Sequence, residues 1–262
     1  MSRQTIIVSG ASRGLGAATA RSAAQLGANV VLAARSEDEL QAVAQTIEAR
    51  GRQALAVVAD VSRAADCQRV VAQAVEAFGG IDALVNNAGI LGPIAPIAEA
   101  EPEGWEKNLA VNVLGPFLLT QAALPHLRQR HGHVINVSSG AAISVIQGWG
   151  AYCTAKAAVN HFTRVLAEEE PDVTAIAFRP GVVDTAMQAQ IRREGAGGMP
   201  EETYARFVDY HEQGDLLPPE VPGCALAVLA FYAPHEWSGS FVPWNDEQVQ
   251  SLVVRYGCAP QT

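Results

Sequence analysis

The chain has 262 residues, of which 49% are hydrophobic and 17% are charged. Its 27 acidic and 18 basic residues give a formal net charge of −9, which argues against a nucleic acid or an anionic membrane as partner because both require a concentrated basic surface. The longest uninterrupted apolar run, Cys224 to Ala233, covers about half of the roughly 20 residues that a membrane-spanning helix needs. We therefore expect a cytoplasmic protein with one folded domain over residues 1–262.

Short runs typical of β-strands alternate with longer segments in which apolar residues recur at helical spacing. This alternation predicts right-handed crossovers and a parallel sheet with helices on both faces. A stretch interrupted by glycine and proline, Arg193 to Pro219, is expected to form a mobile loop with a short helix. The expected strands are Thr5–Ser9, Asn29–Ala33, Ala54–Val58, Ala83–Asn86, His133–Val137 and Val173–Phe178.

The first expected strand runs into a glycine-rich turn and then an alanine-rich helix. The turn has G-x-x-x-G-x-G spacing from Gly10 to Gly16, instead of the G-x-G-x-x-G form. Glycines at such a junction let the backbone approach a pyrophosphate, and the helix N-terminus supplies unpaired N–H groups for the anion. A simple tight turn is the alternative, but the position at the start of a βαβ unit favours a dinucleotide site. The candidate contacts are Gly10, Ser12, Arg13, Gly14, Leu15 and Gly16.

The end of the second strand indicates which dinucleotide binds. An NAD site usually has an acidic residue there, about 20 residues after the glycines, that accepts hydrogen bonds from the ribose. This chain has Ala34 at that position and Arg35 directly after it. The Arg35 guanidinium suits a 2′-phosphate, and Arg13 in the glycine turn can reach the same group. We therefore predict NADP(H) in preference to NAD(H), although both arginines also fit ordinary surface positions.

Two further strand ends carry polar residues that suit a nucleotide. Asp60-Val61 follows the third strand, where Asp60 can accept from an adenine amino group or cap the next helix. Asn86-Asn87-Ala88-Gly89 follows the fourth strand, where the asparagines can hold the turn and leave room for a ribose. The cofactor contacts expected here are Asp60, Val61, Asn87, Ala88 and Gly89.

Tyr152 and Lys156 lie four residues apart on an expected helix from Ala151 to Ala167, so their side chains share one helix face. Ser139 ends the fifth strand, where it can bind a substrate oxygen. An ammonium about 4 Å from a phenol is worth about 4 kcal/mol at an effective dielectric constant of about 20. We therefore expect Lys156 to lower the pKa of Tyr152 by roughly three units, toward the range of acid–base catalysis. A Tyr-x-x-x-Lys pair is common on helix surfaces and does not by itself indicate catalysis. Here it indicates a catalytic pair because it follows a dinucleotide-binding half.

The order and spacing of these motifs resemble the short-chain dehydrogenase/reductase family over roughly residues 5–245. The resemblance implies a single Rossmann-type, doubly wound α/β domain with a mostly parallel seven-stranded sheet. It also implies that the nicotinamide lies beside the carboxyl ends of the strands, as the switch-point rule suggests. The matching pieces are the glycine turn, Asp60, Asn86-Asn87-Ala88-Gly89, Asn112, Ser139, Tyr152-x-x-x-Lys156 and Pro180-Gly181-Val182-Val183-Asp184-Thr185.

The resemblance also implies a role for each matching residue. Tyr152 donates a proton to the carbonyl oxygen as hydride reaches the carbon, Lys156 holds the nicotinamide ribose, and Ser139 polarises the carbonyl. Asn112 kinks its helix and holds a water relay toward Lys156, a role that rests on the resemblance alone. No metal is implied. The cofactor contacts implied in this half of the chain are Tyr152, Lys156, Pro180, Gly181, Val183 and Thr185, of which the last two hold the carboxamide.

Three segments resemble the branch with sepiapterin reductases and microbial reductases of vicinal diketones such as benzil. The tail departs from the sepiapterin pattern, because Pro243 stands where an aspartate anchors the pterin ring. Trp244-Asn245-Asp246 replaces the D-G-G strand of many tetrameric members. Because the corresponding helices pair in the family, the resemblance implies a homodimer through the helices that carry Asn112 and Tyr152, with a tetramer as the alternative. The resembling segments are Gly148–Cys153, Leu166–Val173 and Pro180–Gln188.

The residues expected around the reacting groups are apolar, which suits an aromatic or aliphatic ketone. A lid over about residues 186–217 is expected to close on them, with Tyr204, Phe207 and Tyr210 either facing the pocket or packing against another helix. We predict an NADPH-dependent reductase of an apolar vicinal dicarbonyl. The alternatives are a 3-oxoacyl or hydroxysteroid-type dehydrogenase/reductase and a non-catalytic NADP-binding regulator. The expected lining residues are Ile90, Leu91, Pro93, Ile143, Trp149, Val182 and Met187.

Overall fold

A computed structural model describes residues 3–257 and contains one seven-stranded sheet in the order β3-β2-β1-β4-β5-β6-β7. Each neighbouring pair of these strands is parallel. The predicted doubly wound α/β architecture is therefore confirmed, and the six predicted strands match to within one residue at each end. The strands are β1 Thr5–Ser9, β2 Asn29–Ala34, β3 Ala54–Val58, β4 Ala83–Asn86, β5 His133–Val137, β6 Thr174–Arg179 and β7 Phe241–Pro243.

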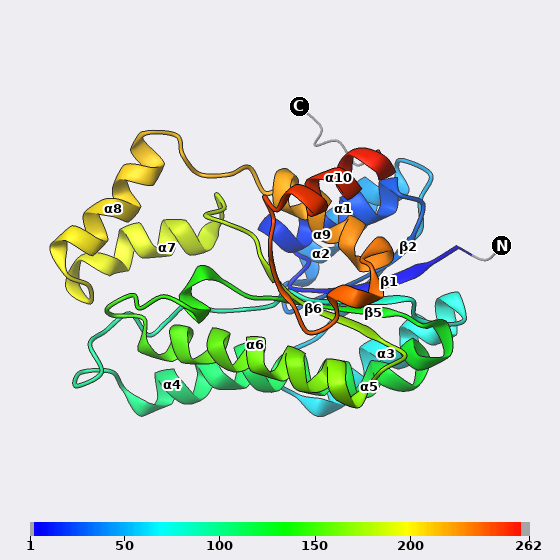
Figure 1. Cartoon of the computed structure of the whole chain (residues 1–262), viewed down its shortest axis with the longest axis horizontal. Helices are drawn as coiled ribbons and strands as arrows, with labels where there is room; N and C mark the ends of the chain where they lie inside the picture. Colours follow the sequence, from blue (N-terminus) through cyan, green and yellow to red (C-terminus); the bar gives the residue numbers. More distant parts are fainter. Residues whose placement is uncertain (1–2, 258–262) are drawn as a thin grey trace.

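Helices cover both faces of the sheet, with α1, α2, α9 and α10 on one side and α3, α4, α5 and α6 on the other (Figure 1). Within residues 3–257, none of the helices is both long enough and apolar enough to cross a lipid bilayer. The helices are α1 Gly14–Gln25, α2 Glu37–Glu48, α3 Ala64–Phe78, α4 Pro102–Leu109, α5 Gly115–Arg130, α6 Gly150–Glu169, α7 Ala186–Glu194, α8 Glu201–Glu212, α9 Glu220–Tyr232 and α10 Glu247–Tyr256.

The alternation of side chains along each strand divides the interior into two hydrophobic cores. In β1, Ile6 and Val8 pack with residues of α1, α2 and α9, whereas Ile7 packs with residues of α3 and α5. All three side chains are fully buried. Strands that are apolar on both faces are typical of parallel sheets covered by helices on each side.

The carboxyl ends of the strands form one edge of the sheet, and this edge positions the candidate site. The strand order reverses beside β1, because β2 pairs with one side of β1 and β4 pairs with the other. A crevice at such a switch point is where open α/β sheets bind their ligands. The loops after β1, β4, β5 and β6 all begin at this edge.

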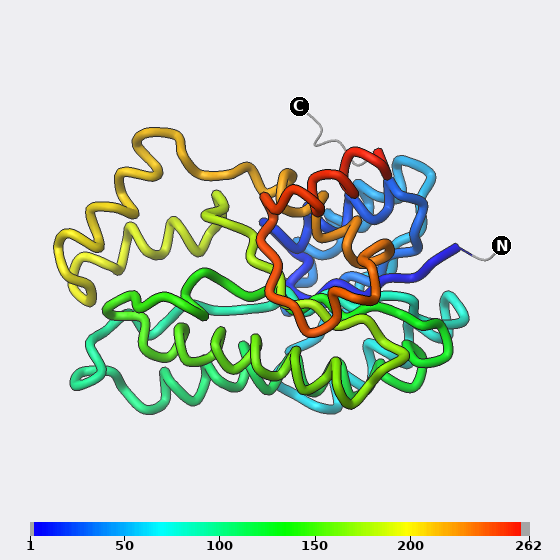
Figure 2. Tube along the Cα trace, viewed as in Figure 1, coloured from blue at the N-terminus to red at the C-terminus, as the bar shows by residue number. Residues whose placement is uncertain are grey.

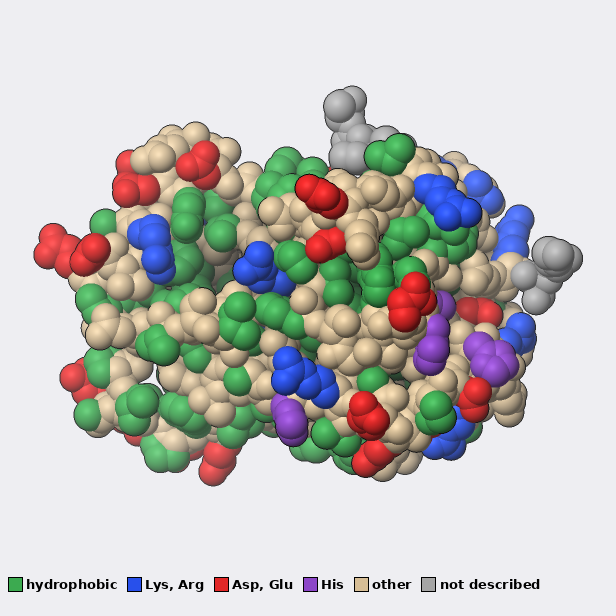
Figure 3. Space-filling view, in the orientation of Figure 1, with side chains coloured by type: hydrophobic (Ala, Val, Ile, Leu, Met, Phe, Trp, Pro, Cys, Tyr) green, Lys and Arg blue, Asp and Glu red, His purple; other side chains and the backbone are tan. Residues whose placement is uncertain are grey.

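Two helices, α7 and α8, project from the body of the molecule at the end opposite the N-terminus (Figure 2). The expectation of a loop with a short helix over Arg193 to Pro219 is wrong in extent, because α8 alone has 12 residues. The glycines of this stretch lie on either side of α8, in the turn after α7 and at Gly214, and Glu201 and Glu202 in the first turn of α8 suit the dipole of a helix. Hydrophobic side chains gather where this pair meets the body, and acidic ones lie toward its outer end (Figure 3).

Candidate active site

Three predicted residues, Ser139, Tyr152 and Lys156, meet at the carboxyl edge of the sheet. Tyr152 and Lys156 lie on α6, whose first residues follow the loop after β5. The Lys156 Nζ lies 5.5 Å from the centroid of the Tyr152 ring and donates a hydrogen bond of 2.8 Å to the Val137 carbonyl. Ser139, two residues after that carbonyl, hydrogen-bonds the Tyr152 side chain. Tyr152 and Lys156 are both buried, so this chemistry is shielded from bulk water.

The protonation of Tyr152 differs from the sequence-based expectation. Burial raises the pKa of Tyr152 to about 12, against the lowering expected from Lys156. Burial also lowers the pKa of Lys156 to about 8, because desolvation disfavours the ammonium. The simple Coulomb argument was wrong here because it placed both groups at a half-solvated surface, whereas the fold buries them together. The phenol is therefore protonated at neutral pH.

Asn112 lies in a π-helical turn, Ala110–Leu114, between α4 and α5. A π-helical turn is a common cause of a helix kink, but the kink at Asn112 stays a prediction. The Asn112 side chain makes a two-way bond with the Ile90 backbone, donating from Nδ2 to the Ile90 carbonyl at 2.8 Å and accepting from the Ile90 N–H at 3.1 Å. A Cβ on Gly89 would come within 2.7 Å of the Asn112 Oδ1, so this approach requires glycine.

The glycine turn forms a cradle of the kind that a pyrophosphate needs. A Cβ on Gly16 would overlap the Gly10 carbonyl oxygen, and a Cβ on Gly10 would come within 2.8 Å of the Ala88 Cα. The N-terminus of α1 has no side-chain cap and no acidic residue in its first turn. Its first N–H groups are thus left for an anion. These features fit a dinucleotide.

Asn87, directly after β4, holds this cradle together. Its Nδ2 donates to the carbonyls of Ser9 at 2.9 Å and Gly10 at 3.2 Å, joining the β4 turn to the glycine turn. Asn86, the last residue of β4, instead donates to Thr120 of α5 and to Asn136 of β5. Of the two roles predicted for this pair, the structure confirms turn formation for Asn87, while the contact with a ribose stays a prediction.

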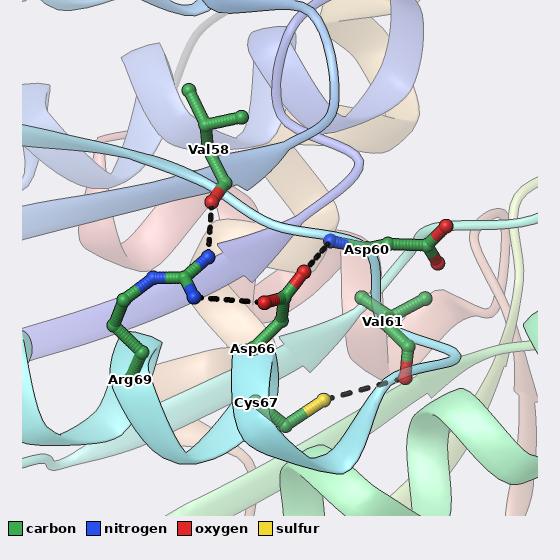
Figure 4. A network of polar contacts seen from close by, with 6 residues as sticks. All are labelled: Val58, Asp60, Val61, Asp66, Cys67 and Arg69. Carbon is green, nitrogen blue, oxygen red and sulfur yellow. Dashed lines mark hydrogen bonds and ion pairs between the residues drawn. The ribbon is translucent and has the colours of Figure 1, made fainter.

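Asp60, at the end of β3, faces the arginine that was predicted to select the cofactor. Its carboxylate accepts from the Ser62 N–H and hydroxyl, while its own N–H donates to Asp66 at 2.9 Å. Figure 4 shows the Asp60 carboxylate pointing away from Asp66. Burial alone raises the pKa of Asp60, but the bonds from Ser62 and the charge of Arg35 outweigh it, so the pKa lies below its ordinary value. Asp60 is therefore ionised beside Arg35.

The loop after β6 lies next to the glycine turn. A Cβ on Gly14 would lie 3.2 Å from Thr185, which brings the predicted carboxamide contact beside the pyrophosphate cradle. The end of the α7–α8 segment returns to this loop, where the Leu217 N–H donates to Val182 at 2.8 Å and its carbonyl accepts from Asp184 at 2.9 Å. Both ends of the segment over residues 186–217 are thus attached to the loop after β6.

Apolar and aromatic side chains cover Tyr152 on the side of α7 and α8. The Trp149 ring meets Tyr152 edge-on, with centroids 5.8 Å apart, and stacks on Phe207 of α8 at 4.9 Å. Of the expected lining residues, Leu91, Trp149 and Met187 belong to this cluster; Ile90, Pro93 and Val182 do not, and Ile143 is 68% exposed. We name the buried set the aromatic cluster: Leu91, Ala141, Trp149, Tyr152, Ile191, Met199 and Phe207.

The model of the short chain dehydrogenase family matches residues 4–196. This chain belongs to that family. It is 33% identical to a benzil reductase ((S)-benzoin forming) of Saccharomyces cerevisiae over 258 residues, covering 94% of this chain and 97% of that protein. A benzil reductase of Bacillus cereus is 43% identical over 152 residues, covering 56% of this chain and 60% of that one. The structure of a yeast short-chain dehydrogenase/reductase superposes with a TM-score of 0.90 at 36% identity, covering 95% of this chain and 99% of that one.

Asn108 is a residue of this dehydrogenase that the sequence interpretation missed. Its side chain is fully buried, and its Oδ1 accepts from the Asn112 Nδ2 at 2.8 Å. Its Nδ2 donates to the carbonyls of Leu91 at 3.0 Å and Gly92 at 2.8 Å. The signal was present, because Asn108 and Asn112 are four residues apart and so lie on one helix face. Together they hold the loop that carries Leu91 into the aromatic cluster.

The α7–α8 segment supplies two further residues of the dehydrogenase site that were not predicted. Ile191 of α7 and Met199, in the turn before α8, pack in the aromatic cluster, and no local pattern marks them as pocket residues. The aromatic residues of α8 follow both of the predicted alternatives. Phe207 stacks on Trp149, whereas the Tyr204 hydroxyl donates to the Arg192 carbonyl at 2.7 Å and joins α8 to α7.

Proposed function

We propose that this short-chain dehydrogenase is an NADPH-dependent reductase that converts an apolar vicinal dicarbonyl into a hydroxyketone. The observation that carries the proposal is the aromatic cluster packed on Tyr152, whose members are aromatic or aliphatic side chains and methionine and include no charged group. Two benzil reductases among the relatives support the same substrate class. Such a lining favours aryl or alkyl substituents over a charged substrate.

Each residue of the site has a separate role in the proposed reduction. Bound NADPH supplies the hydride. The protonated Tyr152 hydroxyl donates its proton to the substrate oxygen, and the phenolate that remains is stabilised by the nearby Lys156. Ser139 donates a hydrogen bond to the same oxygen and stabilises its developing charge. A pKa of about 12 for Tyr152 keeps the phenol in the form that reduction requires.

The proposed preference for NADPH depends on the end of β2. Ala34 offers no carboxylate to ribose hydroxyls, and Arg35 lies beside the ionised Asp60. Arg13 is exposed and reaches toward α2, where its Nη1 lies 3.5 Å from the Glu39 carboxylate. Two guanidinium groups at the entrance of the crevice suit a 2′-phosphate.

We also propose that the protein is a homodimer through α5 and α6. Leu114, Phe117 and Val165 are each between 40% and 43% exposed, although they are large and apolar. Phe117 packs edge-on against Phe162, which joins the two helices into one apolar face. Burial of this face in a partner removes apolar surface from water. The cytoplasmic location expected from the sequence stays a prediction.

NADPH oxidation with a panel of ketones tests the proposed activity. The panel contains benzil, a 3-oxoacyl thioester and a 3-ketosteroid, with NADH run beside NADPH. The proposal predicts the highest kcat/KM for benzil with NADPH. A higher kcat/KM for the thioester would favour a 3-oxoacyl reductase instead, and a higher kcat/KM for the steroid would favour a hydroxysteroid-type dehydrogenase. Tight NADPH binding without turnover of any carbonyl would favour a regulator instead.

A further inference from the structure

A cavity with a basic lining lies between α1, α2 and the turn that joins α2 to β3, and its volume is about 190 Å³. We call it the arginine cavity, because three of its lining side chains are arginines on a chain whose formal net charge is −9. Among the lining residues that the structure describes, none is acidic. The arginine cavity is therefore a local concentration of positive charge. Its polar lining residues are Arg21, Gln25, Thr46, Arg50 and Arg52.

The backbone brings these arginines together at the edge of the sheet opposite the candidate active site. Both α1 and α2 begin after the carboxyl end of a strand, so their last turns, which line the cavity, lie at the amino edge. Arg21 lies in α1, whereas Arg50 and Arg52 flank Gly51 in the turn after α2. Gly51 has a φ of 72°, in the left-handed region that favours glycine. Its N–H donates to the carbonyl of Glu48, the last residue of α2, at 2.8 Å, which fixes the turn.

Most of the positive charge in the arginine cavity has no acidic partner. Arg21 lies 3.4 Å from the Glu220 carboxylate at the start of α9. Arg50 and Arg52 form no salt bridge with any residue from 3 to 257. The carbonyl ends of α1 and α2 attract cations, but each end carries only about half a charge. Because neighbouring like charges repel each other, an anion placed among the three guanidinium groups is stabilised.

We propose that the arginine cavity binds a phosphate group, at a site separate from that of the dinucleotide. Each guanidinium offers a planar fork of N–H donors that matches phosphate oxygens, and the oxygens of one phosphate accept from several guanidinium groups at once. A carboxylate has two oxygens and is matched by a single fork, so three arginines favour phosphate. The apolar lining residues, Ala24 and Ile47, are buried and exclude water from one part of the cavity, which strengthens interactions between charges.

Calorimetric titration with inorganic phosphate tests the site in protein saturated with NADP⁺, which occupies the proposed contacts of Arg13 and Arg35. We expect one phosphate per chain and a Kd that rises about tenfold in Arg50→Gln and in Arg52→Gln, the effect of one charge-assisted hydrogen bond. Arg130→Gln removes the same charge from α5, on the other face of the sheet (Figure 1), and is expected to leave the Kd unchanged. No phosphate binding to the wild type, or the same Kd change in all three variants, would overturn the proposal.

NMR locates the bound phosphate without any substitution. In ¹⁵N-labelled wild type saturated with NADP⁺, inorganic phosphate is expected to move the backbone amide resonances of Arg50, Gly51 and Arg52 more than those of the glycine turn. Acetate at the same ionic strength is expected to move them much less.

Glycerol 3-phosphate distinguishes the source of the phosphate group. Tighter binding than inorganic phosphate supports the site as one for a phosphate ester, and weaker binding supports it as one for the free ion. Equal shifts with acetate and phosphate, or the largest shifts outside the arginine cavity, would contradict the proposal.

Discussion

Replacement of Asn108 by leucine removes hydrogen bonds from the buried link between α4 and the loop after β4. Leucine has a similar volume, so the change removes polar contacts with little loss of packing. In the wild type, the Asn108 Nδ2 donates to the Leu91 carbonyl at 3.0 Å, and the Asn108 Oδ1 accepts from the Asn112 Nδ2 at 2.8 Å. Leucine leaves the Leu91 carbonyl and one Asn112 Nδ2 hydrogen without a partner. The Gly92 carbonyl loses a bond of 2.8 Å but is partly reached by solvent.

The size of the effect follows from the number of buried groups that lose a partner. Each unsatisfied buried group costs about 1–3 kcal/mol, and two of them are buried here. Apolar burial of the leucine offsets about 1 kcal/mol of this cost. We therefore expect Asn108→Leu to lower the free energy of unfolding by about 1–5 kcal/mol, which at about 2–4 °C per kcal/mol corresponds to a decrease in Tm of roughly 2–20 °C for a chain of this size.

Thermal and urea unfolding of purified protein measure this loss. Asn29→Leu is the matched control, because Asn29 is also buried but its Oδ1 has no hydrogen-bond partner. We expect Asn29→Leu to be within about 1 kcal/mol of the wild type, since no bond to that oxygen is lost. Equal stability of Asn108→Leu and Asn29→Leu would refute the reasoning, because it would mean that the four-residue pair with Asn112 does not hold the loop.

Three further predictions address the cofactor, the buried lysine and the assembly. Arg35→Ala is expected to reduce the preference for NADPH over NADH about tenfold through loss of a charge-assisted bond, and calorimetric Kd values for both cofactors check this; an unchanged ratio would reject the role of Arg35. Burial lowers the pKa of Lys156 from 10.5 to about 8, so the unfolded chain binds the extra proton between these values and stability rises with pH across this window. The stability of Lys156→Met relative to the wild type is therefore expected to decrease from pH 8 to pH 10.5 in urea unfolding, and a constant difference would contradict the burial argument. Phe117→Glu is expected to convert a dimer into a monomer in light scattering at micromolar concentration, whereas a monomeric wild type would disprove the α5–α6 interface.

The strands and the polar site residues were predictable because local patterns encode them. Apolar runs bounded by glycine gave β1 to β6, and the residues after the strands meet at one edge because parallel strands share their direction. The predicted Ser139, Tyr152 and Lys156 lie together for the same reason. The positions of these residues along the chain were enough to predict that they meet, because a parallel sheet brings the ends of its strands together.

The remaining features depend on tertiary packing that no local pattern contains. Phe207 belongs to the aromatic cluster only because α8 folds back over Trp149. The pKa values of Tyr152 and Lys156 depend on complete burial, which outweighs the attraction between neighbouring groups on one helix face. Asn108 could have been recognised from its spacing to Asn112, but its three carbonyl acceptors come from a loop whose path is set by the whole fold.

The central claim is that Tyr152 delivers the proton in the reduction of a dicarbonyl by NADPH. The most direct measurement compares the rate of NADPH oxidation with benzil in the wild type and in Tyr152→Phe, with the NADPH Kd of each determined by fluorescence titration. We predict a loss of activity of about a thousandfold or more, with the Kd for NADPH changed less than about twofold. A Tyr152→Phe variant that retains a tenth of the wild-type rate would contradict the account.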